Sequence, residues 1–275
     1  TAQWHILNLN SSDKQPSNYN DLSACLGQYC IVAKNGFWGL MNTDGSSVIP
    51  CQFDWLEFAD ENYLIAQRRG KWGIVDNSGK TVFDYSLSAI YKDGNSRFLR
   101  VKNEKGMMAF FDIISLKYAS EWFDDIEAFD AGRALVRSGH QYILIDNSIN
   151  TLHRFKKDSL RYLKCNLYTF KEAGKFGLIN ESGVILRKAK YAQINQCSDS
   201  KIAFKENGRY GYFNDEGTTA IKPSYILAWD FKNGLARVIQ DRGVIFIDSS
   251  GEKAVPGRYI EVGDFYQGLA RYQSF

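Results

Sequence analysis

The amino-acid sequence repeats with a period of 34 residues. The period is clearest at Trp38 and Trp72, which are each followed by glycine. The same position, called here the landmark, recurs with one interval of 36 residues at Met108, Tyr142, Phe176, Tyr210 and Val244. One step back from Trp38 it falls on Trp4. A repeat of this kind dominates the choice of fold, because each repeat is one unit that buries its apolar face against its neighbours.

Turn residues flank the landmark on both sides. Four residues after it, every repeat has Asn or Asp, at Asn8, Asn42, Asp76, Asp112, Asp146, Asn180, Asn214 and Asp248. Three residues later glycine follows in most repeats, at Gly45, Gly79, Gly183, Gly217 and Gly251. Another glycine precedes the landmark by two residues, at Gly36, Gly70, Gly106, Gly174 and Gly208. Asn and Asp side chains cap tight turns and glycine accepts positive φ, so we expect a hairpin on each side of the landmark strand.

Apolar residues keep the same phase in the second half of the repeat. Fifteen residues after the landmark stand Tyr19, Phe53, Phe123, Tyr191, Tyr225 and Tyr259. Each repeat therefore predicts an apolar strand (29–34 in one repeat), the landmark strand (37–41), a third strand (46–50) and a fourth extended or irregular segment. No window has a sustained period of 3.6 residues, so the sequence predicts an all-β fold.

The repeat frame also predicts how the chain is closed. The repeat of Trp4 lacks its first strand, and residues 269–274 read as such a strand. Eight units of 34 residues and one two-residue insertion account for 274 of the 275 residues. We expect one domain, residues 1–275, forming an eight-bladed β-propeller closed by pairing the N- and C-terminal segments in one blade. The alternative is a linear β-solenoid. The repeat of 34 residues is shorter than a WD-type blade, which has roughly 40–45 residues. A blade of three strands is therefore an alternative to one of four.

Composition excludes several function classes. Aromatic residues make up 15% of the chain, and most fall at the landmark and fifteen residues after it, where we expect them in the core between units. The net charge is +3, with the two signs interleaved, so we expect no nucleic-acid partner. No run of 18 apolar residues occurs, so we expect no membrane insertion. We expect a monomer.

The five cysteines give no metal or redox motif. Cys25 and Cys197 fall where other repeats have phenylalanine or leucine, and we interpret them as small core residues. No Cys-x-x-Cys spacing occurs, which disfavours a zinc site and a thioredoxin-type pair. We expect a reduced, cytoplasmic setting, with an exported protein as the alternative.

Residues 71–79, Lys-Trp-Gly-Ile-Val-Asp-Asn-Ser-Gly, resemble the bacterial WG-repeat family. So do residues 231–238 and 265–272, which share the pattern Phe-x-x-Gly-Leu-Ala-Arg. The resemblance extends over essentially the whole chain and is specific in the repeats at Trp38, Trp72, Phe176 and Tyr210. It implies a repeat protein of interaction type and carries over no catalytic residue. It also implies that the tryptophan packs on the neighbouring unit and that the glycine stands where a side chain would clash.

Chemistry-bearing residues form no recognisable site. The three histidines, His5, His140 and His153, lack metal-ligand spacing, and no nucleophile or nucleotide-binding motif is present. We interpret Asp124, Asp125 and Glu127 as solvated acids. The recurring Asn or Asp is a turn residue rather than a calcium ligand, because glycine follows it at a constant spacing. We expect no catalytic residue, metal or cofactor. An enzyme with a site at the ring axis is a minor alternative.

One segment departs from the composition of the chain. Residues 153–164, the basic segment, contain one histidine and five Lys or Arg against one Asp. The candidate residues are His153, Arg154, Lys156, Lys157, Arg161 and Lys164. We predict that they form a docking patch for an acidic protein partner. The alternative is a solvated edge with scattered charge.

Together these features favour a non-enzymatic protein-interaction module or scaffold. The alternative is a propeller of lectin type that binds a carbohydrate or another small ligand. In that case we expect sugar rings to stack on Trp55, Trp122 and Trp229, which lie away from the landmark position and are free to be exposed.

Overall fold

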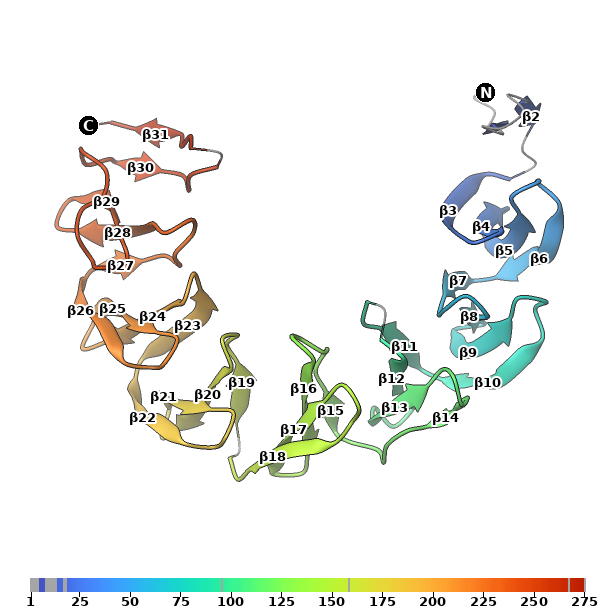
Figure 1. The fold of residues 1–275 in the computed structure, drawn as a ribbon, viewed down its shortest axis with the longest axis horizontal. Coiled ribbons are helices and arrows are strands. Elements are labelled where there is room, and N and C mark those ends of the chain that lie inside the picture. Colours follow the sequence, from blue (N-terminus) through green and yellow to red (C-terminus); the bar gives the residue numbers. More distant parts are fainter. Residues whose placement is uncertain are drawn as a thin grey trace. The chain divides into compact units, whose positions relative to one another are not determined.

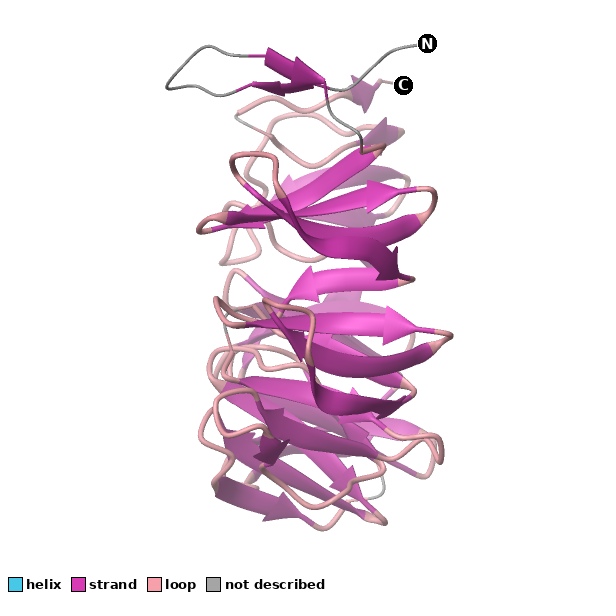
Figure 2. Cartoon of the chain, turned by 90° about the vertical axis from the view of Figure 1, so that its right-hand side faces the viewer, coloured by secondary structure: helices cyan, strands magenta, loops and turns pink. Residues whose placement is uncertain are grey.

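The computed structural model describes residues 5–7, 14–16, 19–94, 96–157, 159–266 and 268–274. Every regular element in these residues is a β-strand, as Figure 2 shows, so the predicted all-β fold is confirmed. The described part of the chain accordingly has no helix long and apolar enough to span a membrane. The chain divides into two compact units, residues 1–139 with 145–150 and residues 140–144 with 151–275.

The first unit is built from antiparallel sheets of four consecutive strands (Figure 1). The first sheet has β3 (Asp21–Leu26), β4 (Tyr29–Lys34), β5 (Phe37–Asn42) and β6 (Ser47–Phe53). The second has β7 (Trp55–Phe58), β8 (Tyr63–Arg68), β9 (Lys71–Asp76) and β10 (Thr81–Leu87). The third has β11 (Ala89–Lys92), β12 (Phe98–Lys102), β13 (Met108–Asp112) and β14 (Lys117–Tyr118). Strands β15 (Asp125–Ile126) and β16 (Arg133–Ser138) follow, and β17 (Gln141–Asp146) has residues in both units.

The second unit continues the same pattern from β18 (Thr151–Phe155). One sheet has β19 (Leu160–Tyr162), β20 (Leu167–Glu172), β21 (Lys175–Asn180) and β22 (Ile185–Tyr191). The next has β23 (Gln193–Ser198), β24 (Lys201–Glu206), β25 (Arg209–Asn214) and β26 (Thr219–Tyr225). A three-stranded sheet has β27 (Leu227–Ala228), β28 (Ala236–Gln240) and β29 (Gly243–Ile247).

The landmark strand is the third strand of each four-stranded sheet. Its landmark residue pairs with the residue fifteen positions later, as Trp38 does with Phe53 and Tyr210 with Tyr225. The predicted fourth segment of the repeat, however, does not belong to a single sheet. Its first residue ends one sheet, and the rest of it begins the next. Phe53 ends one sheet, whereas Trp55 begins the next, because the backbone N–H of Asp54 already donates to the carbonyl of Gln67 in the following sheet (2.9 Å). Four strands, and not three, make up a complete unit.

The Asn or Asp after the landmark closes the turn as predicted. The carboxylate of Asp248 accepts hydrogen bonds from the hydroxyl of Ser250 (2.6 Å) and from the backbone N–H groups of Ser250 (2.9 Å) and Glu252 (3.1 Å). These bonds, with the Ser250 hydroxyl first, hold the pKa of Asp248 below its usual value. Gly251 completes the turn at a φ of 90°. The side chain is therefore committed to the turn, as expected for a cap.

Each hydrophobic core lies between two adjacent sheets, as expected for stacked repeats. In the first unit one core combines Ile31, Leu40 and Phe53 of the first sheet with Leu56, Leu64 and Val75 of the second. The ring of Trp38 packs against this core and meets Trp55 of the next sheet edge-on, with 5.9 Å between the ring centres. The predicted contact of the landmark ring with the neighbouring unit is therefore confirmed.

Two pairs of short strands each represent half of a unit. Strand β1 (His5–Leu7) pairs with β2 (Lys14–Pro16), and these correspond to the landmark strand and the third strand of the repeat frame. Strand β30 (Glu261–Val262) pairs with β31 (Tyr272–Gln273), and these correspond to the first two strands of a sheet. The two pairs thus contain the four strand types of one blade. Ring closure and the number of eight blades concern the arrangement of the two units, and both stay predictions.

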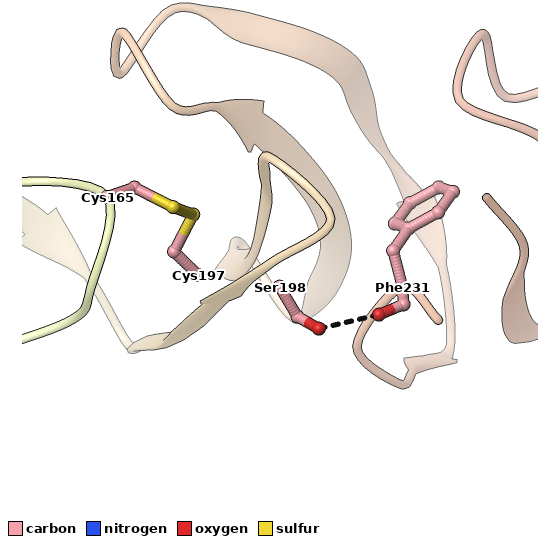
Figure 3. Close-up of a disulfide and its surroundings, with 4 residues drawn as sticks. All are labelled: Cys165, Cys197, Ser198 and Phe231. Atoms are coloured by element: carbon pink, nitrogen blue, oxygen red, sulfur yellow. Dashed lines mark hydrogen bonds between the residues drawn. A yellow bond between two sulfur atoms is a disulfide. The ribbon is translucent and has the colours of Figure 1, made fainter. Parts of the chain in front are cut away.

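The interpretation of Cys197 as a core residue is confirmed and that of Cys25, which is exposed, is wrong; both cysteines form disulfides, which was not predicted. Cys25 stands opposite Cys30 in the β3–β4 hairpin and is bonded to it. Cys165 follows β19 and is bonded to Cys197 of β23 in the next sheet (Figure 3). The backbone N–H of Cys197 donates to the carbonyl of Leu163 (2.7 Å), which brings the two cysteines together. The remaining cysteine, Cys51, is a free thiol and half-buried.

Candidate interaction surfaces

Two cations of the basic segment, Lys157 and Arg161, make contacts within the second unit. The ammonium group of Lys157 pairs with Glu172 and lies 4.2 Å from the ring centre of Phe170. The guanidinium group of Arg161 donates to the carbonyl of Ile194 in the next sheet (2.9 Å). These contacts give both cations a role in holding the fold, which the sequence pattern did not distinguish from a role in docking.

His153 fills the space above a turn glycine. Its ring meets that of Phe155 edge-on at 4.6 Å between the ring centres. A Cβ atom on Gly183 would lie 2.3 Å from its Nε2 atom. The imidazole is therefore packed against the neighbouring turn, and any contact it makes with a partner would have to use its outer edge.

The other three residues, Arg154, Lys156 and Lys164, are exposed. We call them the unpaired cations, because none has an ion-pair or side-chain hydrogen-bond partner among the residues that the structure describes. Asp158 of the same segment lies outside the described residues. The structure thus reduces the predicted patch of six to three side chains that are available to a partner.

The turn that carries Lys164 has an unusual backbone. Lys164, Cys165 and Asn166 have φ values of 70°, 51° and 57°, so three consecutive residues other than glycine adopt the left-handed conformation. This region is unfavourable for residues with a Cβ atom. The turn is held by the Cys165–Cys197 disulfide and by two backbone hydrogen bonds, in which Leu163 N–H donates to the carbonyl of Leu167 (2.8 Å) and Leu167 N–H to that of Lys164 (3.1 Å).

The three tryptophans of the lectin-type alternative differ in exposure. The side chain of Trp55 is 44% exposed. The ring of Trp122 packs on Tyr118, with 5.1 Å between centres, and joins the core of its unit. The ring of Trp229 lies under the guanidinium group of Arg237 (4.8 Å). Only Trp55 therefore presents an open ring, and the stacking role of all three stays a prediction.

The predicted acidic cluster is used by the local backbone. The carboxylate of Asp124 accepts a hydrogen bond from the backbone N–H of Gly139 (2.5 Å) and lies 3.9 Å from Arg137. No group of three or more His, Cys, Asp or Glu side chains within the described ranges is arranged to hold a metal ion. His5 lies in β1, whose side chains the structure does not describe.

A groove in the first unit was not anticipated. It has a volume of about 750 Å³ and is lined by Phe37, Gln52, Asp54, Arg68, Arg69, Lys71 and Tyr85. We call it the cationic groove. These residues come from the β4–β5 and β8–β9 hairpin ends of two adjacent sheets, from β6 and β10, and from the link between the sheets. One signal in the sequence points to it: Arg69 precedes a turn glycine where two other repeats have Asn35 and Asn207.

The side chains of the cationic groove are held by specific contacts. The guanidinium group of Arg68 donates to the side-chain oxygen of Gln52 (2.8 Å) and lies 5.2 Å and 5.8 Å from the ring centres of Phe53 and Tyr85. The Tyr85 hydroxyl is buried, and this burial raises its pKa. Lys71 pairs with Glu104 outside the groove.

Solved structures show only distant similarity to the chain. Hsv2 of Kluyveromyces lactis is 12% identical, with 70% of this chain and 72% of that chain covered and a TM-score of 0.39. BamB of Moraxella catarrhalis is 15% identical, with 82% and 78% covered and a TM-score of 0.36. Both are propeller proteins. The computationally designed protein Ika8 is 12% identical, with 94% and 93% covered and a TM-score of 0.35. No curated protein matches the sequence.

The family comparison agrees with the repeat frame. The family model of the WG containing repeat matches residues 38–72, 210–242 and 246–274. The first match runs from one landmark to the next, and the second begins at the landmark Tyr210. The third match begins two residues after the landmark Val244, and the chain therefore contains WG containing repeats in these three regions.

Proposed function

We propose that the chain is a non-enzymatic protein-interaction module that receives an acidic protein partner on the basic segment. The observation that carries the proposal is the presence of three exposed cations, Arg154, Lys156 and Lys164, that have no counter-ion among the residues that the structure describes. Unpaired surface charge attracts groups of opposite sign, speeds their encounter and discriminates against partners of like charge.

The surroundings of these residues make the contrast clear. Several other cations of the second unit are neutralised within the fold. The ammonium group of Lys190 lies 2.7 Å from Glu206, and Lys232 and Arg237 both lie 2.7 Å from Asp264. Such pairs contribute little to long-range attraction, because the two charges cancel. The basic segment therefore keeps positive charge available for a partner, unlike these paired cations.

The turn of Lys164 supports the proposal in a second way. Its left-handed backbone is fixed by the disulfide to Cys197, so the side chain starts from a restrained position. A group that is ordered before binding loses less conformational entropy on binding. This arrangement suits a recognition residue better than a flexible loop would.

The two disulfides also bear on the setting of the protein. Disulfides persist in oxidising compartments and are rare where thiols are kept reduced. They support the exported alternative over the cytoplasmic one. Thiol labelling of the protein in fractionated cells of the source organism tests this: we expect one reactive thiol per chain, Cys51. Five reactive thiols would favour the cytoplasmic setting.

Charge reversal tests the interaction proposal. The test variant combines Arg154→Glu, Lys156→Glu and Lys164→Glu. The control variant combines Lys175→Glu, Lys188→Glu and Lys222→Glu, which change three exposed cations of the same unit that also lack ion-pair partners within the described residues. Lys157 and Arg161 are kept, because their contacts hold the fold.

The measurement is capture of crosslinked partners from extracts of the source organism. We expect the wild type and the control variant to capture the same acidic protein. We expect the test variant to capture at least ten times less of it. Equal capture by the two variants contradicts the proposal. Because both variants change the net charge by the same amount, a nonspecific charge effect would affect them alike.

A further inference from the structure

The cationic groove has an excess of positive charge. Arg68, Arg69 and Lys71 line it together with one carboxylate, that of Asp54. Because Lys71 is paired with Glu104, the excess rests on Arg68 and Arg69. The carboxylate of Asp54 is directed in part to the backbone N–H of Gly70, at 3.4 Å. Arg69 is exposed and has no ion-pair or side-chain hydrogen-bond partner in the described part of the chain. The groove therefore has the charge that suits a negatively charged ligand.

The backbone at Arg69 is held in a conformation that does not favour arginine. Its φ is 52°, and Gly70 follows at 74°, as in the two-residue turn of a β-hairpin. Asn followed by Gly is the preferred sequence there, and Asn35 and Asn207 occupy the same place at 54° and 49°. Non-glycine residues in the left-handed region are concentrated at functional sites. Arginine at this turn costs stability, and its position at the rim of the groove offers a reason for its presence.

An aromatic ring complements the charge. The side chain of Phe37 is 45% exposed and lines the same groove. The corresponding residues of two other repeats with intact hairpin turns are Lys175 and Arg209. An exposed aromatic ring packs well on the C–H face of a pyranose, because that face of the sugar is apolar. The side-chain amide of Gln52, whose oxygen accepts from Arg68, supplies an N–H donor for sugar hydroxyl groups.

We propose that the cationic groove binds an acidic sugar. Its carboxylate, sulfate or phosphate group meets Arg68 and Arg69, and the C–H face of the ring packs on Phe37. A guanidinium group binds such oxyanions through two parallel N–H groups. The site goes beyond the protein interaction proposed above, because it lies in the other unit and uses different residues. It also differs from the tryptophan positions of the lectin-type alternative.

Isothermal titration tests the site with four defined probes. Trigalacturonate carries carboxylates, a chondroitin sulfate disaccharide carries a sulfate, glucose 6-phosphate carries a phosphate, and maltotriose is neutral. We expect at least one acidic probe to bind ten times more tightly than maltotriose. The acidic probe that binds best identifies the oxyanion. Acetate and inorganic phosphate, titrated alone, show whether the sugar ring contributes.

Arg69→Asn is the decisive variant, because asparagine suits the turn. We expect it to weaken binding of the acidic probe at least tenfold while the midpoint of urea unfolding stays the same or rises. Loss of binding then cannot come from loss of the fold. Arg209→Asn, a change of an exposed cation beside the corresponding turn at Asn207, serves as the control and should leave binding unchanged. Phe37→Ala should weaken binding of the acidic sugar but not binding of acetate or inorganic phosphate.

Several results would overturn the proposal. Binding of none of the three acidic probes, or equal affinity for maltotriose, would exclude recognition of an acidic sugar. Acetate or inorganic phosphate binding as tightly as the sugars would remove the sugar from the proposal. Unchanged binding in Arg69→Asn would place the ligand elsewhere. None of these outcomes affects the basic segment, whose test uses residues of the second unit.

Discussion

A Cβ atom on Gly39 would lie 2.5 Å from the carbonyl oxygen of Ile49. Gly39 is the glycine of the Trp-Gly pair in β5, and Ile49 lies in β6, whose register with β5 shifts beside it. Gly211 and Ile221 repeat the relationship at the same distance, 2.5 Å. The glycine is therefore required because the bulged fourth strand of the sheet passes where a side chain would begin, which confirms the predicted clash.

The glycine also correlates with the length of the strand that follows the landmark strand, the fourth of each sheet. Where it is present, that strand has seven residues, in β6, β10, β22 and β26. Where Ala109 replaces it, β14 has two residues. Where Ile143 replaces it, β18 has five. The Trp-Gly signature thus specifies a close approach of two strands rather than a site of chemistry.

Replacing Gly39 by alanine tests this relationship. We expect Gly39→Ala to lower the free energy of unfolding by about 1–3 kcal/mol, because the backbone of β6 must move. Gly263→Ala is the control, because a Cβ atom there would lie 3.8 Å from its nearest neighbour, and it should leave the free energy of unfolding unchanged or raise it by up to about 1 kcal/mol. The measurement is the urea concentration at the midpoint of unfolding, determined for both variants. A loss in Gly39→Ala no larger than that in the control contradicts the close approach.

The disulfide between Cys165 and Cys197 should stabilise the second unit. Its cysteines are 32 residues apart, so the double change Cys165→Ser and Cys197→Ser should cost about 3–4 kcal/mol through loop closure. Cys51→Ser removes the free thiol and is the control. Urea unfolding without reductant measures both. A midpoint for the double variant equal to that of the control would show that the bond does not form.

Asp112 should make stability fall in acid. Arg97 first, then Ser115 and the backbone N–H of Ile114, hold the pKa of this carboxylate far below its ordinary value of about 3.9. A depressed pKa contributes stability above the unfolded value, and this contribution is lost as the pH falls through the folded one. We expect Asp112→Asn to be about 1–2 kcal/mol less stable at pH 7 and to approach wild type near pH 2. A difference that stays constant across this range contradicts the assignment.

A change at a turn residue should raise the stability of the protein rather than lower it. Ala173 precedes a turn glycine and has a φ of 46°, where Asn207 stands in the next sheet at 49°. Ala173→Asn should raise the free energy of unfolding by about 0.5–1 kcal/mol, and Asn207→Ala should lower it by a similar amount, because asparagine tolerates the left-handed region better than alanine does. Thermal unfolding of both variants is the measurement. Equal midpoints would show that neither turn limits stability.

The repeat frame made much of the fold predictable from the sequence. The pairing of Trp38 with Phe53 and the turn at Asp248 both follow from residue spacing. The blade boundary at Trp55 was not predictable in this way. The extended segment around it keeps a fixed place in the repeat, and such a segment can equally end one sheet or begin the next. The Cys165–Cys197 bond was missed for a related reason: the two cysteines stand at different repeat positions and meet only across a sheet boundary.

The sites were less accessible to sequence reasoning. Charge alone marked the basic segment, but it could not tell Lys157 and Arg161, which the fold uses, from Lys156 and Lys164, which it leaves exposed. The cationic groove collects residues from two hairpins, from β6 and β10 and from the link between the sheets, so no single run of sequence contains it. Its best signal was Arg69 at a turn position that suits asparagine.

The central claim is that the unpaired cations of the basic segment receive an acidic partner. The most direct measurement is the affinity of a labelled 12-residue peptide of alternating Glu and Asp, followed by fluorescence anisotropy. We expect the combined Arg154→Glu, Lys156→Glu and Lys164→Glu variant to bind at least ten times more weakly than wild type. Arg69→Asn and the control with Lys175, Lys188 and Lys222 reversed should bind within about twofold of wild type. Wild-type affinity in the test variant, or an equal loss in the control, would contradict the claim.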